Sequence, residues 1–296
     1  MTRAAAAERD TDASRCGLCG GPGRPFFEKR GIGVLLCEAC RNAFVPSSAI
    51  PEDLESIYSQ AYFEGGEGTG YPGYLADREL LLRNFGERLA FIESSKPPGR
   101  RLLDVGAAYG LFLKAARDRG WDASGVELAP DCALEAARIS GASVACGDFL
   151  HVRIAGPYDV IVMLDVIEHL RDPRAAVARA FELLAPGGLF VVETGDLRAP
   201  WARLLGRRWY FFDPPAHLFY FSHDGLTELL RKAGFAGDMR VKRAGRRVSA
   251  TNICFKLAAA SKGPLKHVLA TASQRGLPGS LYLNFGDGML IAARKP

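Results

Sequence analysis

Four acidic residues follow short apolar segments at intervals through the middle of the chain. They are Asp104, Glu127, Asp148 and Asp165. If these segments are parallel strands of one open sheet, their carboxyl ends meet at a single edge, which is where open α/β sheets bind ligands. Carboxylates gathered at that edge can accept hydrogen bonds from hydroxyl and amino groups and can hold a positively charged ligand.

A glycine-containing turn comes directly after the first of these acids. In the sequence Asp-Val-Gly-Ala-Ala-Tyr-Gly of residues 104–110, Gly106 and Gly110 permit a positive φ, and the small Ala108 lets a ligand lie against the backbone. A dinucleotide site favours Gly-x-Gly-x-x-Gly, because a pyrophosphate must approach the helix N-terminus. The spacing Gly-x-x-x-Gly after an acid instead favours a cationic ligand without phosphate, such as S-adenosylmethionine. The alternative is a strand-to-helix turn that binds no ligand.

Over about residues 99–196, these features resemble the class I S-adenosylmethionine-dependent methyltransferases. The glycine-rich signature of that family matches residues 104–110, with alanine in the place of the middle glycine, and its Pro-Gly-Gly turn matches residues 186–188. The resemblance implies that Glu127 binds the ribose and that Asp148 binds the adenine edge. The predicted cofactor-binding residues are Asp104, Gly106, Ala108, Gly110, Glu127, Asp148, Phe149 and Asp165.

Two Cys-x-x-Cys pairs near the N-terminus have the spacing of a metal site. They are Cys16 with Cys19 and Cys37 with Cys40, and seventeen residues separate the two pairs. Four thiolates fill the tetrahedral coordination of Zn²⁺ and leave no position for a catalytic water, so the sequence predicts a structural zinc. Free thiols that bind no metal are the alternative. The pairs enclose few basic residues, which favours a packing module over a platform for RNA.

Two histidines are candidates for a catalytic base. Methyl transfer from a sulfonium needs a base only where the acceptor must lose a proton, and imidazole titrates near neutrality. His217 comes first, because residues 216–222 are similar to a His-x-x-Tyr-Phe-Ser segment of zinc-containing sugar C-methyltransferases, in which the histidine acts as base. His169 comes second, because Asp165, Glu168 and His169 resemble acids and a histidine that quinone-type O-methyltransferases use for a divalent cation. The alternatives are that each histidine only orients its own loop.

The apolar pattern predicts the elements that position these residues. Strands are expected at 101–105, 122–127, 142–146, 158–164 and 189–194, and helices from 110, at 130–139 and at 173–184. Such alternation predicts the fold class: α/β, with a doubly wound, Rossmann-like seven-stranded methyltransferase sheet and a small N-terminal zinc ribbon. We expect the sheet to close with strands near 239–242 and 289–293, separated by a helical excursion through 251–260 and 265–272.

The domain organisation that follows has four parts. They are a disordered tail at 1–15, the zinc ribbon at 16–50, a helical cap or lid at 51–98, and a methyltransferase domain at 99–296 with an acceptor-side insertion at 197–237. The cap contains a helical pattern at 75–94 and a glycine-rich stretch at 65–70. Four aromatic residues near that stretch could form a lid, with a core or interface role as the alternative: Tyr62, Phe63, Tyr71 and Tyr74. We expect the aromatic insertion to roof the acceptor pocket, and Ser222 or His223 to cap the next helix.

Composition limits the setting in which the protein works. The chain has 296 residues, of which 48% are hydrophobic, and no apolar run approaches the roughly eighteen residues of a membrane span. Neither a signal peptide nor an even cysteine count is present, so we expect a cytoplasmic protein. The net charge of +5 is concentrated in residues 198–247, which hold eleven Arg or Lys against four Asp or Glu. This basic segment is either a solvated face or a docking site for an anionic acceptor.

The sequence therefore predicts an S-adenosylmethionine-dependent methyltransferase with a structural zinc ribbon and a small-molecule acceptor, for which an anionic group is one alternative. Sugars, nucleotide sugars and secondary metabolites, methylated on oxygen or carbon, are the expected acceptor classes. A second hypothesis is an RNA methyltransferase that docks through the ribbon and the basic segment. A third is a binding protein that has kept the fold and lost catalysis. The sequence does not indicate an oligomeric state.

Overall fold

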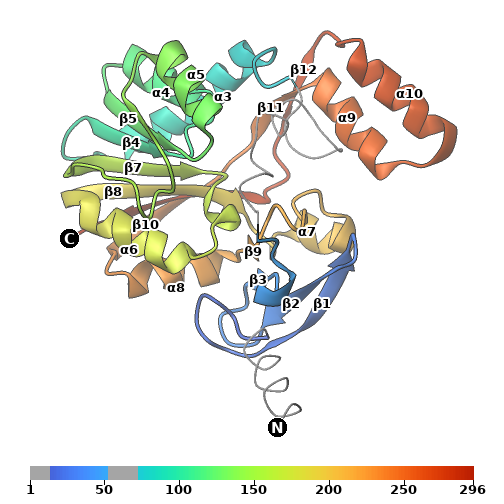
Figure 1. Cartoon of the computed structure of the whole chain (residues 1–296), viewed down its shortest axis with the longest axis horizontal. Helices are drawn as coiled ribbons and strands as arrows, with labels where there is room; N and C mark the ends of the chain where they lie inside the picture. The colour runs from blue at the N-terminus through green and yellow to red at the C-terminus, as the bar shows by residue number, and fades with distance from the viewer. Residues whose placement is uncertain (1–13, 53–72) are drawn as a thin grey trace.

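A seven-stranded sheet with helices on both faces forms the centre of the molecule in our computed structural model, which describes residues 14–52 and 73–296 (Figure 1). The strands lie in the order β10-β13-β8-β7-β4-β5-β6. In chain order their bounds are β4 (Arg101–Val105), β5 (Asp122–Glu127), β6 (Val144–Cys146), β7 (Tyr158–Leu164), β8 (Leu184–Gly195), β10 (Ala236–Arg243) and β13 (Gly288–Arg294). The predicted fold class is confirmed.

Six of these strands run in one direction, and β13 alone runs in the opposite direction. β4 pairs in parallel with β5 and β7, and β7 pairs in parallel with β8. β13 lies antiparallel between β8 and β10, with Ile291 opposite both Val192 and Val241. The predicted hairpin of strands that are far apart in the sequence is therefore present, and the carboxyl ends of the parallel strands share one edge.

Alternating apolar side chains along the strands build a core on each face of the sheet. Leu102, Val160 and Val191 pack on one face, and their neighbours pack on the other, because successive residues of a strand point in opposite directions. Figure 1 shows α3, α4 and α5 over one face and α6 and α8 over the other. The bounds of these helices are α3 (Arg78–Ser94), α4 (Leu111–Asp118), α5 (Pro130–Ser140), α6 (Pro173–Leu183) and α8 (His223–Lys232).

The N-terminal module shares a sheet with the insertion that follows β8. Its strands β1 (Gly23–Lys29), β2 (Ile32–Cys37) and β3 (Ala43–Phe44) form a four-stranded sheet with β9 (Phe219–Tyr220). The partners across the last pair are Ala43 with Tyr220 and Phe44 with Phe219. Short helical turns complete this region: η1 (Ser47–Ala49), α7 (Pro200–Leu205) and η5 (Gly206–Arg208). The N-terminal module is thus joined edge to edge to the insertion at 197–237, which we expected to cover the acceptor pocket.

A helical arm is inserted between the closing strands β10 and β13 and projects from the domain at the upper right of Figure 1. It consists of β11 (Arg246–Ser249), α9 (Ala250–Ala260), α10 (Gly263–Gln274) and β12 (Ser280–Leu283), and β11 pairs antiparallel with β12. The predicted helical excursion is therefore confirmed, with a two-stranded stalk that the sequence analysis did not predict.

Most predicted element boundaries agree with the structure within one or two residues, but β8 begins at Leu184 instead of 189, β10 begins at Ala236 instead of 239, and helix α3 begins late. We expected this helix from Leu75, but residues 73–77 form turns, and the carboxylate of Asp77 accepts hydrogen bonds from Ser249 (2.7 Å) and Asn252 (2.8 Å) of the arm. Ser222 caps α8, as one of the two predicted alternatives, because its hydroxyl accepts from the backbone N–H of Gly225 (3.1 Å). The predicted tail, the glycine-rich stretch and the lid residues Tyr62, Phe63 and Tyr71 lie outside the described residues, apart from the last two residues of the tail.

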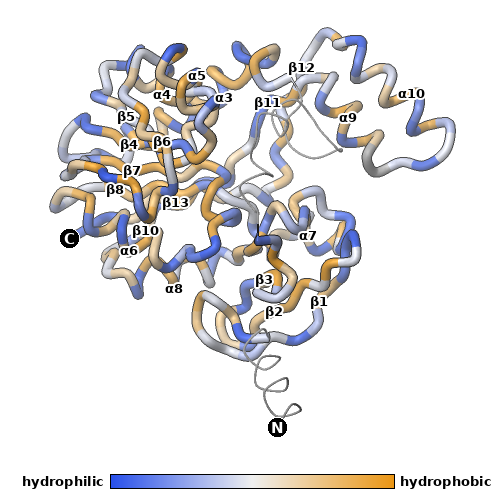
Figure 2. Tube along the Cα trace, in the orientation of Figure 1, coloured by the Kyte–Doolittle hydropathy of each residue, from blue (hydrophilic) through white to orange (hydrophobic). Residues whose placement is uncertain are grey.

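Hydropathy along the trace follows this architecture. The strands at the centre of the molecule are strongly hydrophobic, and the arm alternates between hydrophobic and hydrophilic residues (Figure 2). Among the helices of residues 14–52 and 73–296, none combines the length and the apolar character needed to cross a bilayer.

Candidate functional site

The turn after β4 holds its backbone in conformations that favour small residues. Gly106 has φ of 78° and Gly110 has φ of 74°, and Ala108 between them has φ of 48°. A Cβ on Gly106 would lie 2.5 Å from a methyl carbon of Val166, so a side chain there clashes as well as straining the backbone. Gly110 is the N-cap residue of α4. The turn therefore presents bare backbone at the edge of the sheet.

Glu127, at the end of β5, is fixed by the same turn. One carboxylate oxygen accepts a hydrogen bond from the backbone N–H of Ala108 (2.8 Å), and the other accepts from the N–H of Ala129 (3.0 Å). Burial raises the pKa of this carboxyl group, and the backbone donors partly offset that rise. Its remaining lone pairs can accept from a ligand at the sheet edge, because a carboxylate offers about four acceptor sites.

Asp104 lies deeper at the same edge, with 3% of its surface exposed. Burial raises the pKa of its carboxyl group to about 8, and the nearby charge of Glu127 adds to the rise. A positively charged ligand would reverse this effect, because it stabilises the ionised form. Asp104 is thus suited to hold a cation rather than a phosphate.

A cavity of about 540 Å³ opens at this edge of the sheet. Eight of the predicted site residues line it: Asp104, Gly106, Ala108, Glu127, Asp148, Phe149, Asp165 and His169. Tyr74, one of the four predicted lid aromatics, also lines it. Gly110 and His217 are not among the lining residues. The structure therefore brings the strand-end acids together, as the pattern predicted, and places His169 in the same cavity. His217 does not line the cavity.

An ion-pair network forms the opposite wall of the cavity. The guanidinium of buried Arg88 on α3 donates two hydrogen bonds to Glu193 of β8, at 2.8 and 2.6 Å. Arg246, at the base of the arm, lies 3.3 Å from a carboxylate oxygen of Asp165 and 3.6 Å from Glu193. Asp165 holds the pKa of Arg246 well above its ordinary value. Burial alone would raise the pKa of Glu193, but the Arg88 charge outweighs it and holds that pKa below its usual range.

The two histidines lie against each other beside this wall. Their rings pack edge to face with centroids 4.6 Å apart. His169 Nδ1 lies 2.8 Å from the carbonyl oxygen of Ala216, and His217 Nδ1 lies 2.7 Å from that of Phe211. Because a carbonyl only accepts, each ring donates through Nδ1, and Nε2 is the basic nitrogen of the neutral ring. Burial lowers the pKa of both imidazoles, so they are neutral at pH 7.

Glu168 lies next to these rings and is fully buried. Its carboxylate oxygens have no hydrogen-bond partner within the described structure, and one carboxylate oxygen lies within 4.8 Å of nitrogens of His169 and His217. Burial raises the pKa of this carboxyl group well above its usual value, and the nearby Asp165 adds to the rise. The predicted group of Asp165, Glu168 and His169 is therefore assembled in space, with His217 as a further member.

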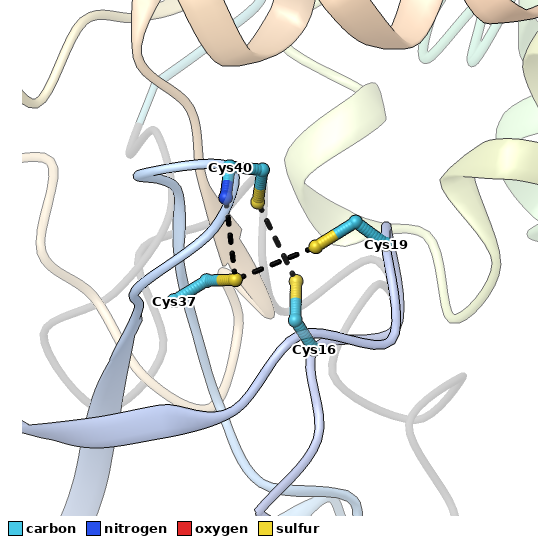
Figure 3. A group of neighbouring side chains, drawn as sticks. All are labelled: Cys16, Cys19, Cys37 and Cys40. Atoms are coloured by element: carbon cyan, nitrogen blue, oxygen red, sulfur yellow. Dashed lines mark hydrogen bonds between the residues drawn. The ribbon is translucent and has the colours of Figure 1, made fainter.

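The four cysteines of the N-terminal module converge from its two turns (Figure 3). Cys16 and Cys40 have their sulfur atoms 3.7 Å apart, and those of Cys19 and Cys37 are 3.4 Å apart. All four sulfur atoms lie within 4.8 Å of one another. A tetrahedral Zn²⁺ with Zn–S bonds of about 2.3 Å places its sulfur ligands about 3.8 Å apart. The spacing and chemistry of this donor set therefore fit zinc.

The N-terminal module is linked to the histidines through β9. The backbone N–H of Val45 donates to the carbonyl oxygen of Leu218 (2.8 Å), and the N–H of Leu218 donates to that of Glu168 (2.8 Å). Ala216, two residues earlier, provides the carbonyl that His169 contacts. The N-terminal module thus holds the segment just before β9, whose Ala216 carbonyl orients His169.

Sequence analysis missed Arg88, Glu193 and Arg246 as residues of the cavity. Glu193 could have been found, because it follows the apolar run of a predicted strand just as the four chosen acids do. Arg88 lies within a predicted helix whose polar face gives no sign of a buried partner, and Arg246 follows a strand that was predicted only approximately. Their roles depend on pairing across 105 and 81 residues, with Glu193 and Asp165 respectively.

A mostly parallel sheet with acids at its carboxyl edge, a glycine turn after β4 and a closing antiparallel strand defines the class I methyltransferase fold. Residues 74–238, more than half of the chain, match the family model of a methyltransferase domain, and the chain belongs to this family. A solved S-adenosylmethionine-dependent methyltransferase of Thermotoga maritima, described as a possible histamine N-methyltransferase, has the same fold. It covers 76% of this chain and 94% of its own, with a TM-score of 0.50 and 20% identity.

Two curated relatives are similar in sequence. A ubiquinone biosynthesis O-methyltransferase of Psychrobacter arcticus is 35% identical over 106 residues, which are 32% of this chain and 41% of that protein. A malonyl-[acyl-carrier protein] O-methyltransferase of Serratia marcescens is 30% identical over 189 residues, which are 58% of this chain and 72% of that protein. The chain therefore spans less than half the length of the first relative and about seven tenths of the second.

Proposed function

We propose that the protein transfers the methyl group of S-adenosylmethionine to an oxygen atom of a small-molecule acceptor. The observation that carries this proposal is the single cavity in which strand-end carboxylates and a neutral histidine line the same space. The family supports methyl transfer, and both curated relatives are named as O-methyltransferases, which favours oxygen over carbon or nitrogen. A volume of about 540 Å³ lies in the range of ligand sites.

The strand-end acids would hold the cofactor. Glu127 would accept from the ribose hydroxyls, and Asp148 with Phe149 would bind the adenine from the edge and the face. Asp104 would face the positively charged methionine end, because its carboxyl group becomes ionised where a cation lies beside it. Gly106 and Ala108 would allow the ligand to lie against the backbone of the turn. Gly110 would contribute by starting helix α4 rather than by contact.

His169 is the proposed general base, with His217 as its positioning partner. The hydrogen bond from Nδ1 to Ala216 fixes the His169 ring, and Nε2 would be the nitrogen that takes a proton. In the reaction, the acceptor oxygen forms a bond to the methyl carbon, the bond from carbon to sulfur breaks, and the electron pair stays on the sulfur of S-adenosylhomocysteine. The acceptor proton passes to Nε2. His217 packs on the ring and keeps it from turning.

The four cysteines would hold a structural zinc. The metal would supply folding free energy to the N-terminal module, because so small a unit buries too little apolar surface to fold alone. All four coordination positions would be filled by sulfur, so no step of the reaction passes through this ion. Its role would be to keep β3 in place beside β9.

The variant His169→Ala tests the assignment. We expect the rate of S-adenosylhomocysteine formation, measured on a panel of phenols and hydroxylated sugars, to fall about 10²- to 10⁴-fold. The affinity for S-adenosylhomocysteine should be unchanged, because the ring orients no cofactor contact. His267→Ala is the matched control, since this exposed histidine of α10 is not among the residues that line the cavity. Unchanged turnover in His169→Ala would rule out the base assignment.

A salt titration separates this proposal from RNA methylation. Turnover of a small acceptor should vary little with salt, whereas RNA binding through the basic segment would weaken steeply as salt rises. RNA-dependent turnover with that salt dependence would contradict the small-molecule proposal.

A further inference from the structure

The helical arm is attached to the domain mainly at its base, and Lys256 of α9 also lies over the ring of Tyr210, 5.8 Å from its centroid. Residues 244–287 leave the sheet after β10 and return at β13, and the stalk of β11 and β12 separates α9 and α10 from the central sheet (Figure 1). The two helices pack against each other. Such an arm contributes little to the core of the domain, which indicates that its surface has a role other than stabilising the fold.

Apolar side chains on the arm face solvent. No residue of the twelve-residue helix α10 is buried. Within this helix Leu265 is 58% exposed and Val268 is 65% exposed, and Leu281 of the stalk is 60% exposed. Seven of the thirteen exposed large apolar residues among the described residues belong to the arm: Leu257, Leu265, Val268, Leu277, Leu281, Tyr282 and Phe285. A surface this rich in apolar side chains is typical of an interaction site.

The charges of the arm have one sign. Between Ala250 and Gly286 the sequence contains no Asp or Glu, and its four cations are Lys256, Lys262, Lys266 and Arg275. Figure 2 shows hydrophilic and hydrophobic residues interleaved along both helices. Basic residues beside exposed apolar residues on short helices are the pattern of segments that lie in the interface of an anionic bilayer.

We propose that the arm docks on an anionic lipid surface. A second copy of the arm is a poor partner, because pairing would bring two sets of four cations together. Neither α9 nor α10 reaches the roughly twenty residues needed to span a bilayer, so the arm lies on the surface rather than crossing it. The base of the arm lines the cavity through Arg246, Arg247 and Val248. Docking of the arm therefore also brings the cavity close to the membrane.

Vesicle flotation of the full chain tests this inference without any methyl acceptor. We expect the protein to float with phosphatidylcholine vesicles that contain phosphatidylglycerol, and to stay in solution with phosphatidylcholine alone. Lys262→Gln with Lys266→Gln should weaken binding about twenty-fivefold, since each basic residue contributes about fivefold near such a surface. Leu265→Ser with Val268→Ser should weaken it at least about tenfold through lost apolar burial.

The matched control is Leu134→Ser, which removes a 73% exposed leucine of α5, remote from the arm. This variant should bind vesicles like the wild type. Equal binding to both kinds of vesicle, or binding to neither, would overturn the proposal. A dimer in sedimentation that becomes a monomer in Leu265→Ser with Val268→Ser would instead identify the arm as a self-association surface, and would also overturn it.

Discussion

One wall of the cavity comes from a single run of the chain, whereas the opposite wall is collected from distant segments. The first wall holds Asp104, Glu127 and Asp148, within 45 residues of sequence and on or just after three adjacent strands. The second wall combines α3, the end of β8, His169 after β7 and the base of the arm. The first wall therefore depends on local geometry, and the second depends on long-range contacts that separate perturbations can break.

Removing the predicted zinc should have the largest effect, and it should disturb the second wall without disturbing the first. Structural zinc contributes on the order of 10 kcal/mol to a module of this kind, so chelation should release β3 from β9. His169 would then lose its fixed orientation, and we expect methyl transfer to fall at least about hundredfold. The affinity for S-adenosylhomocysteine, measured by calorimetry, should stay within about threefold of the wild type, because the backbone of the turn after β4 and the N–H of Ala129, not β9, hold Glu127.

Cys19→Ser with Cys37→Ser should reproduce the effect of chelation. Cys146→Ser is the matched control, because this thiol is exposed and lies outside the cluster. Metal analysis should find about one zinc per chain in the wild type and in the control. Full methyl transfer by protein without zinc would show that the second wall does not depend on the module.

Glu193→Gln should destabilise the protein without affecting the first wall. The variant leaves the buried guanidinium of Arg88 without a charged partner, and breaking a buried pair costs about 3–5 kcal/mol. Urea unfolding followed by circular dichroism measures this loss. Arg88→Met with Glu193→Leu should recover most of the stability, because no buried charge remains unpaired.

Glu135→Gln is the control for a surface pair, since Glu135 contacts Arg138 in solvent on α5. We expect no measurable change in stability for this variant. If Glu193→Gln were equally harmless, the network would not hold the second wall together.

The pH dependence of cofactor affinity tests the first wall with a smaller effect. The pKa of Asp104 is about 8, so its ionised fraction rises from about one tenth at pH 7 to about nine tenths at pH 9. The affinity for S-adenosylmethionine, relative to that of Asp104→Asn, should therefore rise about tenfold across this range. The variant corrects for titration of the ligand itself. A constant ratio would mean that Asp104 does not face the cation.

Ionisation of Asp104 should increase the affinity for the cofactor but decrease the stability of the protein without ligand. A carboxyl group whose pKa is raised in the folded state favours folding at low pH, and this contribution is lost as pH rises through about 8. The thermal midpoint of the protein without ligand should therefore fall as pH rises from about 4 to about 8 and change little above that, and Asp104→Asn should reduce the fall.

The contrast between the walls explains what could be predicted from sequence. Acids after apolar strands and the turn at Gly106 are local signals, so the sheet edge and the closing strands near 239–242 and 289–293 were predicted before the structure was known. The ion pair of Arg88 with Glu193 and the pairing of β3 with β9 at Ala43 and Tyr220 join residues more than one hundred positions apart, and no local pattern encodes them. His217 was selected by local similarity, but its ring lies behind His169 relative to the cavity.

The most direct test of the account is a calorimetric titration of the purified protein with S-adenosylhomocysteine. We predict one binding site per chain, and in Glu127→Ala a loss of affinity of at least about thirtyfold, because the ribose hydroxyls lose their charged acceptor and the turn loses the two backbone contacts to that carboxylate. Glu135→Ala should bind like the wild type. Binding of a phosphate-bearing nucleotide such as NADH, with no heat from S-adenosylhomocysteine, would contradict the assignment of the first wall as the adenosyl site.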